Sequence, residues 1–342
     1  MSVGAPDAAE RLRRWEHWLA QCQEQALDAD APIVDPHHHL WERGGHTYLP
    51  QQFAGDARSG GHALVSSVYV ECLSQYLGSG PAHLRPVGET AYVAGLARPA
   101  REIGEAAIAA GIVAYADLSL ADAADEVLDA HEQAGCGRLR GVRYSTAHDA
   151  DPAIHCAYQT HPGMLREPAV QAGANRLARR GLSIDVWLYF HQLGDVLALA
   201  RACPDLTIVV DHAGGPIGLG PYAGRRAEVF EQWRTALQAL GAHDNIHLKF
   251  GGLAMPLAGF DWRKLPQPPE SSMLAVAWQP YWDVCLDVFG AQRCMFESNF
   301  PVDRSGCSYT ALWNAFKRLA APLTVAERQA VLAGTAQRVY RV

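Results

Sequence analysis

Eight short runs rich in β-branched and aromatic residues alternate with helix-forming stretches, and this alternation restricts the possible fold more than any other feature. The runs cover residues 32–39, 63–72, 111–118, 139–145, 181–190, 206–212, 245–251 and 293–299. The stretches between and after them are rich in Ala, Leu, Glu and Arg, for example 121–134, 167–180, 192–203, 225–240, 278–289, 309–319 and 324–340. Strands that alternate with helices indicate a parallel sheet, and eight is the number that closes a (β/α)₈ barrel. The sequence therefore predicts an α/β protein with a TIM-barrel fold.

The beginning of the chain stands apart from this pattern. Residues 8–27 place apolar side chains along one stripe, which predicts an amphipathic helix ahead of the first strand. No linker, internal repeat or low-complexity tract divides the rest of the chain. We therefore expect an N-terminal helical extension over residues 1–30 and a single barrel domain over residues 31–342. The Pro-rich segment 264–269 is expected to be part of a long loop after the seventh strand.

Composition narrows the classes of function. The chain has 29 Lys and Arg against 36 Asp and Glu, and no block of basic residues resembles a nucleic-acid-binding patch. No apolar run is long enough to span a bilayer, and the first 30 residues lack the apolar core of a signal peptide. The eight cysteines include no CxxC pair, which favours reduced thiols. These features predict a cytoplasmic protein that acts on a small molecule, with no nucleic-acid or membrane partner.

Polar side chains recur on one face of the predicted strands. Because side chains alternate along an extended backbone, Asp35, His37 and His39 are expected to point the same way. The apolar face of a barrel strand packs under the helices, so the polar face belongs in the lumen. The same sorting assigns to the interior Ser67, Tyr69, Glu71, Tyr115, Asp117, Gly141, Arg143, Ser145, Asp185, Trp187, Tyr189, His191, His247, Lys249, Gly251, Met295, Glu297 and Asn299.

An ordinary barrel interior is filled by branched apolar residues, whereas this one would hold several ionisable groups. Burying each without a partner would cost several kcal/mol, although pairs such as Glu71 with Arg143 would satisfy some of them. Their concentration near the carboxyl ends of the strands indicates an active site. Single residues have structural alternatives. His38 has the opposite parity and is expected to be structural, and Trp187 either packs or stacks on substrate. Arg143 and Lys249 either balance the carboxylates or bind a substrate anion.

The sixth run leaves one ambiguity. Val209 and Val210 allow either Asp211 or His212 to face inward. The two polar residues are followed by Ala213-Gly214-Gly215, and a polar pair before glycines is typical of a strand end that opens onto a ligand loop.

Six segments, in chain order, carry a resemblance to a known family, which also extends over the fifth run and the following Gln192-Leu193. They are Val34-Asp35-Pro36-His37-His38-His39-Leu40-Trp41, Val68-Tyr69-Val70-Glu71, Gly141-Val142-Arg143, Val209-Val210-Asp211-His212-Ala213-Gly214-Gly215-Pro216, Leu248-Lys249-Phe250-Gly251-Gly252-Leu253 and Met295-Phe296-Glu297-Ser298-Asn299-Phe300-Pro301-Val302. Over about residues 31–342 the chain resembles the amidohydrolase superfamily, and more narrowly its amidohydrolase-related branch of sugar lactonases, pyrone-dicarboxylate lactonase and decarboxylases. The resemblance implies that His37 and His39 bind a divalent metal or the substrate, and that His212 polarises the substrate carbonyl.

One position departs from the family pattern. The family usually has an Asp at the end of strand eight, as metal ligand and proton-transferring group, where this chain has Asn299. An amide cannot act as a general base and is a weaker metal ligand than a carboxylate. Glu297, on the same face, and Asp303, in the following loop, are the candidates for the missing carboxylate. Metal-independent chemistry or loss of hydrolytic activity are the remaining alternatives.

These features together predict a hydrolase of a small lactone or a related cyclic ester or amide. In the expected reaction water attacks the carbonyl, three histidines stabilise the oxyanion, and a carboxylate takes the proton. The expected catalytic residues are His37, His39, His212, Glu297 and Asp303. The expected substrate-binding residues are Glu71, Arg143, Asp185, Trp187, Lys249 and Asn299.

A metal and two competing functions complete the hypothesis. One divalent ion, zinc or manganese, is expected on His37, His39 and His191, with metal-independent activity as the alternative. A decarboxylase on the same scaffold would release CO₂ instead of opening a ring. A non-catalytic homologue would bind ligands without turnover. The sequence leaves open whether the protein forms a homodimer.

Overall fold

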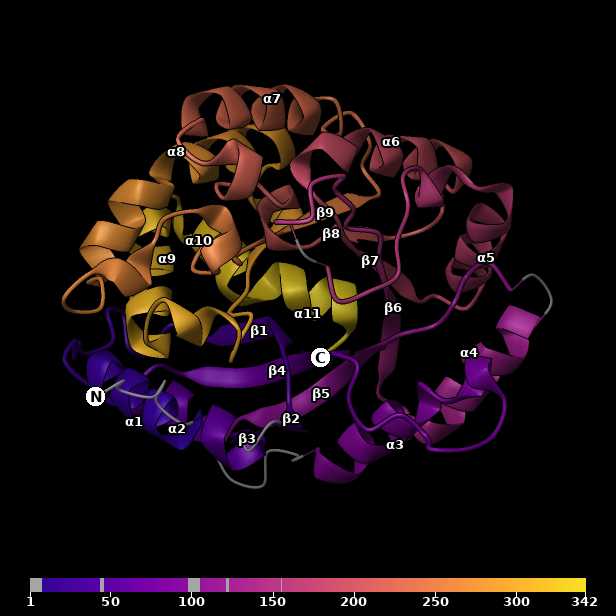
Figure 1. Cartoon of the computed structure of the whole chain (residues 1–342), viewed down its shortest axis with the longest axis horizontal. Coiled ribbons are helices and arrows are strands. Elements are labelled where there is room, and N and C mark those ends of the chain that lie inside the picture. Colours follow the sequence, from indigo (N-terminus) through magenta and orange to yellow (C-terminus); the bar gives the residue numbers. More distant parts are fainter. Residues whose placement is uncertain (1–7, 44–45, 98–104, 121–122, 155) are drawn as a thin grey trace, which may run out of the picture.

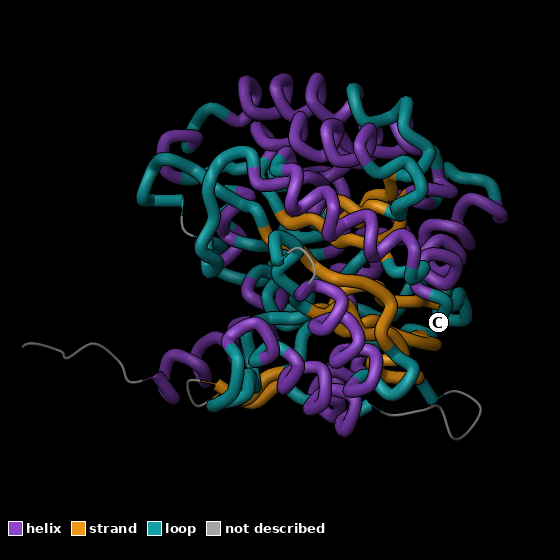
Figure 2. Tube along the Cα trace, turned by 90° about the vertical axis from the view of Figure 1, so that its right-hand side faces the viewer, coloured by secondary structure: helices purple, strands orange, loops and turns teal. Residues whose placement is uncertain are grey.

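The computed structural model describes residues 8–43, 46–97, 105–120, 123–154 and 156–342. Its centre is an eight-stranded parallel sheet surrounded by helices (Figures 1 and 2). In spatial order the strands are β1 Ile33–His38, β4 Leu64–Val70, β5 Ala107–Ala114, β6 Leu139–Ser145, β7 Ser183–Trp187, β8 Ile208–Val210, β9 Ile246–Phe250 and β10 Cys294–Phe296. The TIM-barrel fold predicted from the strand–helix alternation is confirmed.

The barrel closes where β1 meets the segment after β10. The backbone N–H of Asn299 donates to His37 O at 2.8 Å, and that of His39 donates to Phe300 O at 2.7 Å. Asn299 itself has a left-handed backbone, with φ of 51°. This seam places His37 and His39 beside the residues that follow the last strand.

Helices cover the outside of the barrel. Those in the described part of the chain are α1 Ala8–Leu19, α2 Pro50–Ser59, α3 Val87–Leu96, α4 Ala123–Ala134, α5 Pro168–Arg179, α6 Leu193–Ala202, α7 Arg226–Gln238, α8 Ser271–Phe289, α9 Tyr309–Ala320, α10 Val325–Gln329 and α11 Thr335–Tyr340. A separate two-stranded sheet consists of β2 Trp41–Arg43 and β3 His46–Tyr48. The sequence did not predict α2 or α3, and the predicted first helix ends at Leu19. None of the described helices has both the length and the apolar character needed to cross a membrane.

Two apolar clusters make up the core. The larger one packs the strands against the surrounding helices. The smaller one, here called the inner cluster, fills the barrel and consists of Val34, Val68, Val70, Val113, Val209, Met295, Ala333, Ala336, Val339 and Tyr340. Its last four members come from the C-terminal segment, in which a π-helical turn, Ala330–Gly334, joins α10 to α11. Thr335 donates to Ala291 O, just before β10, so this segment closes the amino-terminal end of the barrel.

The first strand differs from its predicted parity. Val34 lies in the inner cluster, whereas Asp35 is directed out of the lumen. One Asp35 carboxylate oxygen accepts from Ser298 N at 3.0 Å and the other from the Tyr309 hydroxyl, on α9, at 3.1 Å. The strand register shifts after Asp35, because Pro36 has no N–H to continue the ladder. Asp35 therefore does not share a face with His37 and His39, contrary to the prediction.

The second barrel strand also contradicts its predicted parity. Val68 and Val70 fill the inner cluster, and the Tyr69 hydroxyl donates to Glu89 of α3 at 2.7 Å. The prediction that Ser67 and Tyr69 face inward is wrong. The lumen near the middle of the barrel takes branched apolar side chains, and in this strand those occupy the even positions.

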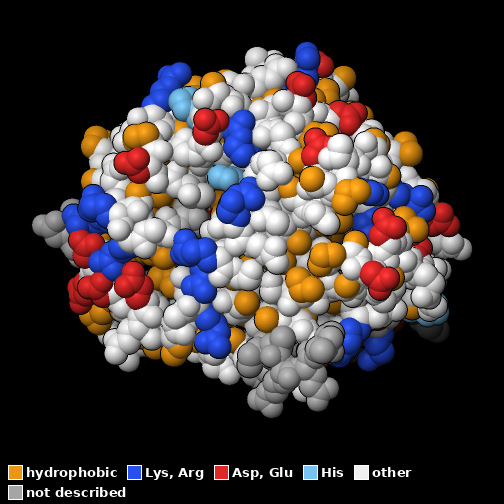
Figure 3. Space-filling view, turned by 180° about the vertical axis from the view of Figure 1, so that it is seen from behind, with side chains coloured by type: hydrophobic (Ala, Val, Ile, Leu, Met, Phe, Trp, Pro, Cys, Tyr) orange, Lys and Arg blue, Asp and Glu red, His pale blue; other side chains and the backbone are white. Residues whose placement is uncertain are grey.

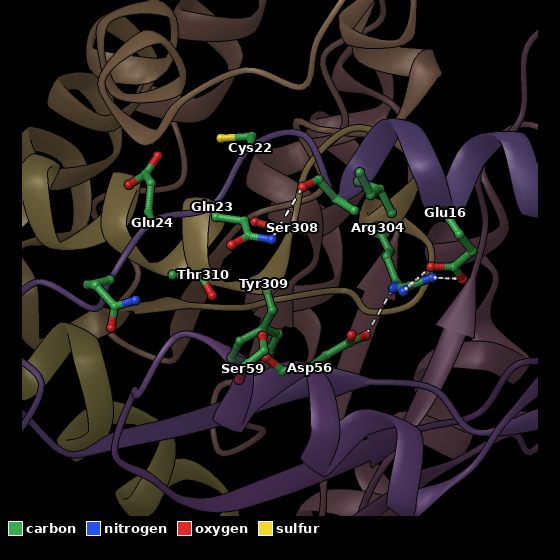
Figure 4. A pocket seen from close by; sticks show the side chains of 13 residues that line it. Glu16, Cys22, Gln23, Glu24, Asp56, Ser59, Arg304, Ser308, Tyr309 and Thr310 are labelled. Atoms are coloured by element: carbon green, nitrogen blue, oxygen red, sulfur yellow. Dashed lines mark hydrogen bonds and ion pairs between the residues drawn. The ribbon is translucent and has the colours of Figure 1, made fainter.

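The N-terminal extension packs against the loops that follow β9 and β10. Trp18 Nε1 donates to Leu265 O at 3.1 Å. The Arg304 guanidinium bonds both carboxylate oxygens of Glu16, at 2.7 and 2.8 Å, and pairs with Asp56 at 3.0 Å. Glu16, Asp56 and Arg304 line a cavity between the extension and the barrel (Figure 4). Its volume is about 330 Å³. The predicted Pro-rich loop thus supports the extension.

Candidate active site

Two histidines and one carboxylate meet at the carboxyl end of the barrel. Glu297 follows β10, and its Oε2 lies 2.8 Å from His37 Nδ1. Its Oε1 lies 2.7 Å from His212 Nδ1 and accepts from the His212 backbone N–H at 3.0 Å. His37 and Glu297 have no exposed surface and His212 is 4% exposed. A single buried carboxylate therefore orients both imidazoles.

An unusual backbone turn brings His212 into the site. The residue has φ of 54°, and Ala213 has φ of 52°, both left-handed. Asp211 also faces the interior, with Oδ1 3.1 Å from the ammonium of Lys249. Both Asp211 and His212 therefore face the interior, because the backbone changes from extended at Asp211 to left-handed at His212. Alternation along an extended strand cannot anticipate such a turn.

Gly252→Ala is expected to displace His212. A Cβ at this position, where φ is 71°, would lie 2.5 Å from the Cβ of His212. Gly137→Ala is a matched control, because φ there is 77° and no described atom lies within 4 Å of the added Cβ. We expect the control to cost about 1–2 kcal/mol of unfolding free energy through left-handed strain. Gly252→Ala should cost about 2 kcal/mol more, measured by urea unfolding, and should lose activity. Equal costs would contradict the proposed close contact.

Beneath the histidines lies a buried ion-pair layer. The Lys249 ammonium is 2.6 Å from Asp185 and 3.1 Å from Asp211, and none of these three residues is exposed. Lys249 also lies 3.3 Å from His37 Nδ1. The prediction that Lys249 and Asp185 bind substrate is not supported by these positions. Both are enclosed below the site and neutralise each other.

A second ion pair lies near the mouth. Arg143 Nε donates to Glu71 Oε1 at 2.7 Å, and the Tyr158 hydroxyl donates to the same oxygen at 2.6 Å. Arg143 also donates to the Tyr158 hydroxyl at 2.9 Å. Within the described part of the chain, the other Glu71 oxygen has no hydrogen-bond partner. Tyr158 comes from the irregular loop after β6, where side-chain periodicity gives no signal, and the sequence did not identify it.

His39, Asn299 and Asp303 form a third group. His39 Nδ1 lies 2.7 Å from Val70 O and therefore carries a proton, which leaves Nε2 as an acceptor. Nε2 lies 3.3 Å from the Asn299 amide oxygen, and the Asn299 amide nitrogen donates to Asp303 at 3.1 Å. Turning the amide by 180° would place its NH₂ against Nε2 and let a protonated Asp303 donate to its oxygen. Asn299 thus links the protonation of Asp303 to His39.

Burial and the neighbouring charges set the protonation of the site. Burial works to raise the pKa of Glu297, but the attraction of His212 and His37 outweighs it and lowers that pKa to about 2. Burial works to lower the pKa of His212, yet Glu297 raises it above the usual value. The pKa of His37 is lowered by burial and by Lys249. Burial raises the pKa of Asp303 to about 7, so this carboxyl group titrates near neutral pH.

The donor set fits a divalent cation. In the described residues, potential ligand atoms of His37, His212 and Glu297 lie within 4.8 Å of one another. Two nitrogens and a carboxylate are ligands that zinc commonly takes. Over the same part of the chain, His37 Nε2 and Asp211 Oδ2 are buried without a hydrogen-bond partner.

The remaining predicted residues are placed differently. His39 lies beside His37, with ring centroids 4.9 Å apart, but it is not in the metal-capable group. His191 is exposed, and its Nε2 is 3.0 Å from His148 O, so we leave it out of the candidate metal site. Trp187 is half-buried, with its ring 4.7 Å from that of His212. Of the predicted ligands, the structure brings only His37 into the described group of three.

Comparison with known proteins agrees with this fold. A family model described as amidohydrolase matches residues 34–342. The chain belongs to the amidohydrolase family. Membership places it among hydrolytic enzymes built on this barrel, and the resemblance read from the six segments is confirmed.

Several family members are similar over most of their length. The uncharacterized protein y4mH of Sinorhizobium fredii is 34% identical over 336 residues, which cover 92% of this chain and all of that protein. An L-fucono-1,5-lactonase of Burkholderia multivorans is 30% identical over 310 residues, 90% of this chain and 95% of that protein. Two crystal structures of a Burkholderia multivorans amidohydrolase, one with bound Hepes and one with bound zinc, have TM-scores of 0.69 and 0.67 at 27% and 25% identity. Each covers 91% of this chain and 100% of the other.

Proposed function

We propose that the protein opens the ring of a neutral, polyhydroxylated lactone by hydrolysis. The observation that carries the proposal is the Glu297 carboxylate shared by His37 and His212 at the barrel mouth. Such a pair of oriented imidazoles suits stabilisation of the oxyanion that forms when water attacks an ester carbonyl. The similarity to an L-fucono-1,5-lactonase supports a lactone as the ester.

The charges of the site favour a neutral substrate. The site has two permanent cations, Arg143 and Lys249, and both are already paired with carboxylates. Apart from Asp303, whose pKa is about 7, it has four buried carboxylates: Glu71, Asp185, Asp211 and Glu297. A divalent ion would balance this count without creating an excess of positive charge. A substrate carboxylate would therefore lack a free partner, whereas sugar hydroxyls can donate to acceptors such as Glu71. We accordingly drop the predicted role of Arg143 and Lys249 in holding a substrate carboxylate.

Asp303 is the proposed proton acceptor. Glu297 is a poor base, because its pKa is about 2 and both its oxygens face histidines. Asp303, with a pKa near 7, is matched to neutral pH. In the proposed reaction Asp303 takes a proton from the attacking water while His212 donates to the developing oxyanion. Asp303 then returns the proton to the departing ring oxygen, so that the C–O bond breaks and a hydroxy acid leaves.

A divalent ion held by His37, His212 and Glu297 would add Lewis-acid polarisation of the substrate carbonyl. In that state the His212 nitrogen facing the ion would carry no proton, so polarisation by the ion would replace the His212 hydrogen bond to the oxyanion. Trp187, packed against His212, limits the space beside that ring and excludes water from one side.

The substrate class is tested by comparing two lactones in one ring-opening assay. We expect kcat/KM for L-fucono-1,5-lactone to exceed that for 2-pyrone-4,6-dicarboxylate by at least about 100-fold, which corresponds to about 3 kcal/mol. Acid release followed with a pH indicator measures both. Faster opening of the dicarboxylate would contradict the neutral-substrate proposal, and CO₂ release without ring opening would favour a decarboxylase.

The pH dependence follows from the role of Asp303. The base must be ionised to take a proton, so kcat/KM is expected to rise with pH and to level off above about pH 7. Asp303→Asn should remove this rise and lower the plateau by about 100-fold or more. Initial rates between pH 5 and pH 9 measure both effects. An unchanged acidic limb in the variant would assign the titration to another group.

A further inference from the structure

The last helical turn of the chain reaches the ion pair beneath the site. Tyr340 ends α11, has no exposed surface and belongs to the inner cluster. Its hydroxyl donates to Asp185 Oδ2 at 2.6 Å, and its ring lies 5.2 Å from the Lys249 ammonium. In Figure 2 the C-terminus lies at the right-hand side, on the face that Figure 3 shows. Tyr340 packs in the inner cluster beside strand residues, so its hydroxyl reaches Asp185 from the end of the barrel that the C-terminal segment closes.

Asp185 joins the C-terminal turn to the site. Its Oδ2 accepts from the Tyr340 hydroxyl and from Lys249, both at 2.6 Å, and its Oδ1 accepts from Ser183 at 3.1 Å. The three donors fix the plane of the carboxylate. The Lys249 ammonium then lies 3.3 Å from His37 Nδ1. The buried side chains of Tyr340, Asp185 and Lys249 therefore form a series of contacts that ends at His37, a residue of the candidate active site.

The position of Lys249 matters for the orientation of His37. Glu297 Oε2 lies 2.8 Å from His37 Nδ1, and the negative charge of this oxygen favours a proton on that nitrogen. Lys249 offers a competing proton to the same nitrogen from 3.3 Å. Which contact prevails depends on how Asp185 and Asp211, at 2.6 and 3.1 Å, hold the ammonium. Without the Tyr340 hydroxyl, Asp185 would keep only Lys249 on Oδ2 and Ser183 on Oδ1, so its carboxylate would be held less firmly.

We propose that Tyr340 is a positioning residue of the candidate active site, which sets His37 through Asp185 and Lys249. An inner-cluster residue with a merely structural role would need only the ring. The hydroxyl would then be a buried donor that has found an acceptor, and its loss would change stability alone. The proposal rests on the proposed function for its kinetic test, but not for its spectroscopic one.

The test compares Tyr340→Phe with Tyr48→Phe. Tyr48 is 2% exposed, and its hydroxyl donates to the carboxylate of Asp56 at 2.8 Å, outside the site. Each variant removes one buried hydroxyl from a carboxylate and keeps the ring, so both should lower the melting temperature. We expect Tyr340→Phe to lower kcat about tenfold with KM within about twofold, as outer partners of active-site histidines do. Tyr48→Phe should leave both constants within about twofold of wild type.

Nitrogen-15 spectra of the histidine side chains provide a readout that needs no substrate. The ring signals of His37, assigned by their loss in His37→Asn, should shift in Tyr340→Phe and stay in place in Tyr48→Phe. Unchanged His37 signals in a folded Tyr340→Phe protein would overturn the proposal, whatever happens to kcat. A kcat within about twofold of wild type would overturn it as well. If no lactone is turned over by the wild type, the proposed function fails, while the His37 signals still decide this inference.

Discussion

Glu297→Gln is expected to lower kcat/KM for lactone opening by about a thousandfold or more. The wild-type carboxylate bonds His212 Nδ1 through one oxygen at 2.7 Å and lies 2.8 Å from His37 Nδ1 with the other. A glutamine has one acceptor oxygen and would turn its NH₂ toward the other ring, where two donors would face each other. One imidazole must then change its proton position or its orientation, and the charge that raises the pKa of His212 is lost.

A suitable control for this variant is Glu24→Gln. Glu24 also accepts with both oxygens, from Ser271 N at 2.6 Å and from Asn314 at 2.8 Å, but it lies in the N-terminal extension. We expect this control to keep kcat/KM within about twofold and to lose only stability. Steady-state rates of acid release measure both variants. An equal loss of kcat/KM in the two variants would mean that removing any buried carboxylate with two partners lowers activity. Glu297 would then have no special role.

The same substitution should also change the pH dependence of stability. The pKa of Glu297 is lowered to about 2 in the folded protein, from an ordinary value of 4.5. A lowered pKa gives stability that is present above about pH 4.5 and is lost as the pH falls toward 2. The shift corresponds to about 3 kcal/mol. The difference in unfolding free energy between wild type and Glu297→Gln should therefore be larger at pH 7 than at pH 3.

His37→Ala is expected to abolish both metal binding and activity. His37 belongs to the group of three residues whose ligand atoms lie within 4.8 Å, and its Nε2 is among the buried acceptors without a partner in the described residues. Removing one of three protein ligands leaves too few donors to hold zinc at micromolar concentration. We expect about one divalent ion per wild-type chain, by elemental analysis, and almost none in the variant.

The matched control for the metal prediction is His191→Ala. His191 is exposed and bonds the backbone oxygen of His148, so its loss should leave metal content and activity within about twofold of wild type. Retention of the ion by His37→Ala would contradict the assignment of the site. Full wild-type activity after removal of all metal by a strong chelator would instead show that the imidazoles act without an ion.

The sequence could predict features that depend on periodicity. Eight runs alternating with helices define a closed parallel barrel, and strand parity correctly directs Arg143 and Glu297 inward, where each meets its partners. The inward position of His37 was predicted as well, but that prediction assumed that Asp35 lies on the same face as His37. Pro36 breaks the register between Asp35 and His37, so the shared face assumed for them does not exist.

Features that depend on irregular backbone or on distant segments could not be predicted. Tyr158 comes from a loop without alternation, and His212 is brought inward by a left-handed turn. Tyr340 reaches the site from the last turn of the chain, across 155 positions from Asp185. A tyrosine at the end of an amphipathic helix has the same local pattern whether its hydroxyl meets water or a buried carboxylate. Only the closure of the barrel decides between the two.

The central claim is that this amidohydrolase-family barrel opens neutral lactone rings at the site organised by Glu297. It is tested most directly by measuring acid release from L-fucono-1,5-lactone by the wild-type protein and by Glu297→Gln at equal concentrations of folded protein. We predict turnover well above the spontaneous rate for the wild type and a rate near background for the variant. Ring opening at equal rates by both proteins would contradict the account, as would failure of the folded wild type to open this or any related neutral lactone.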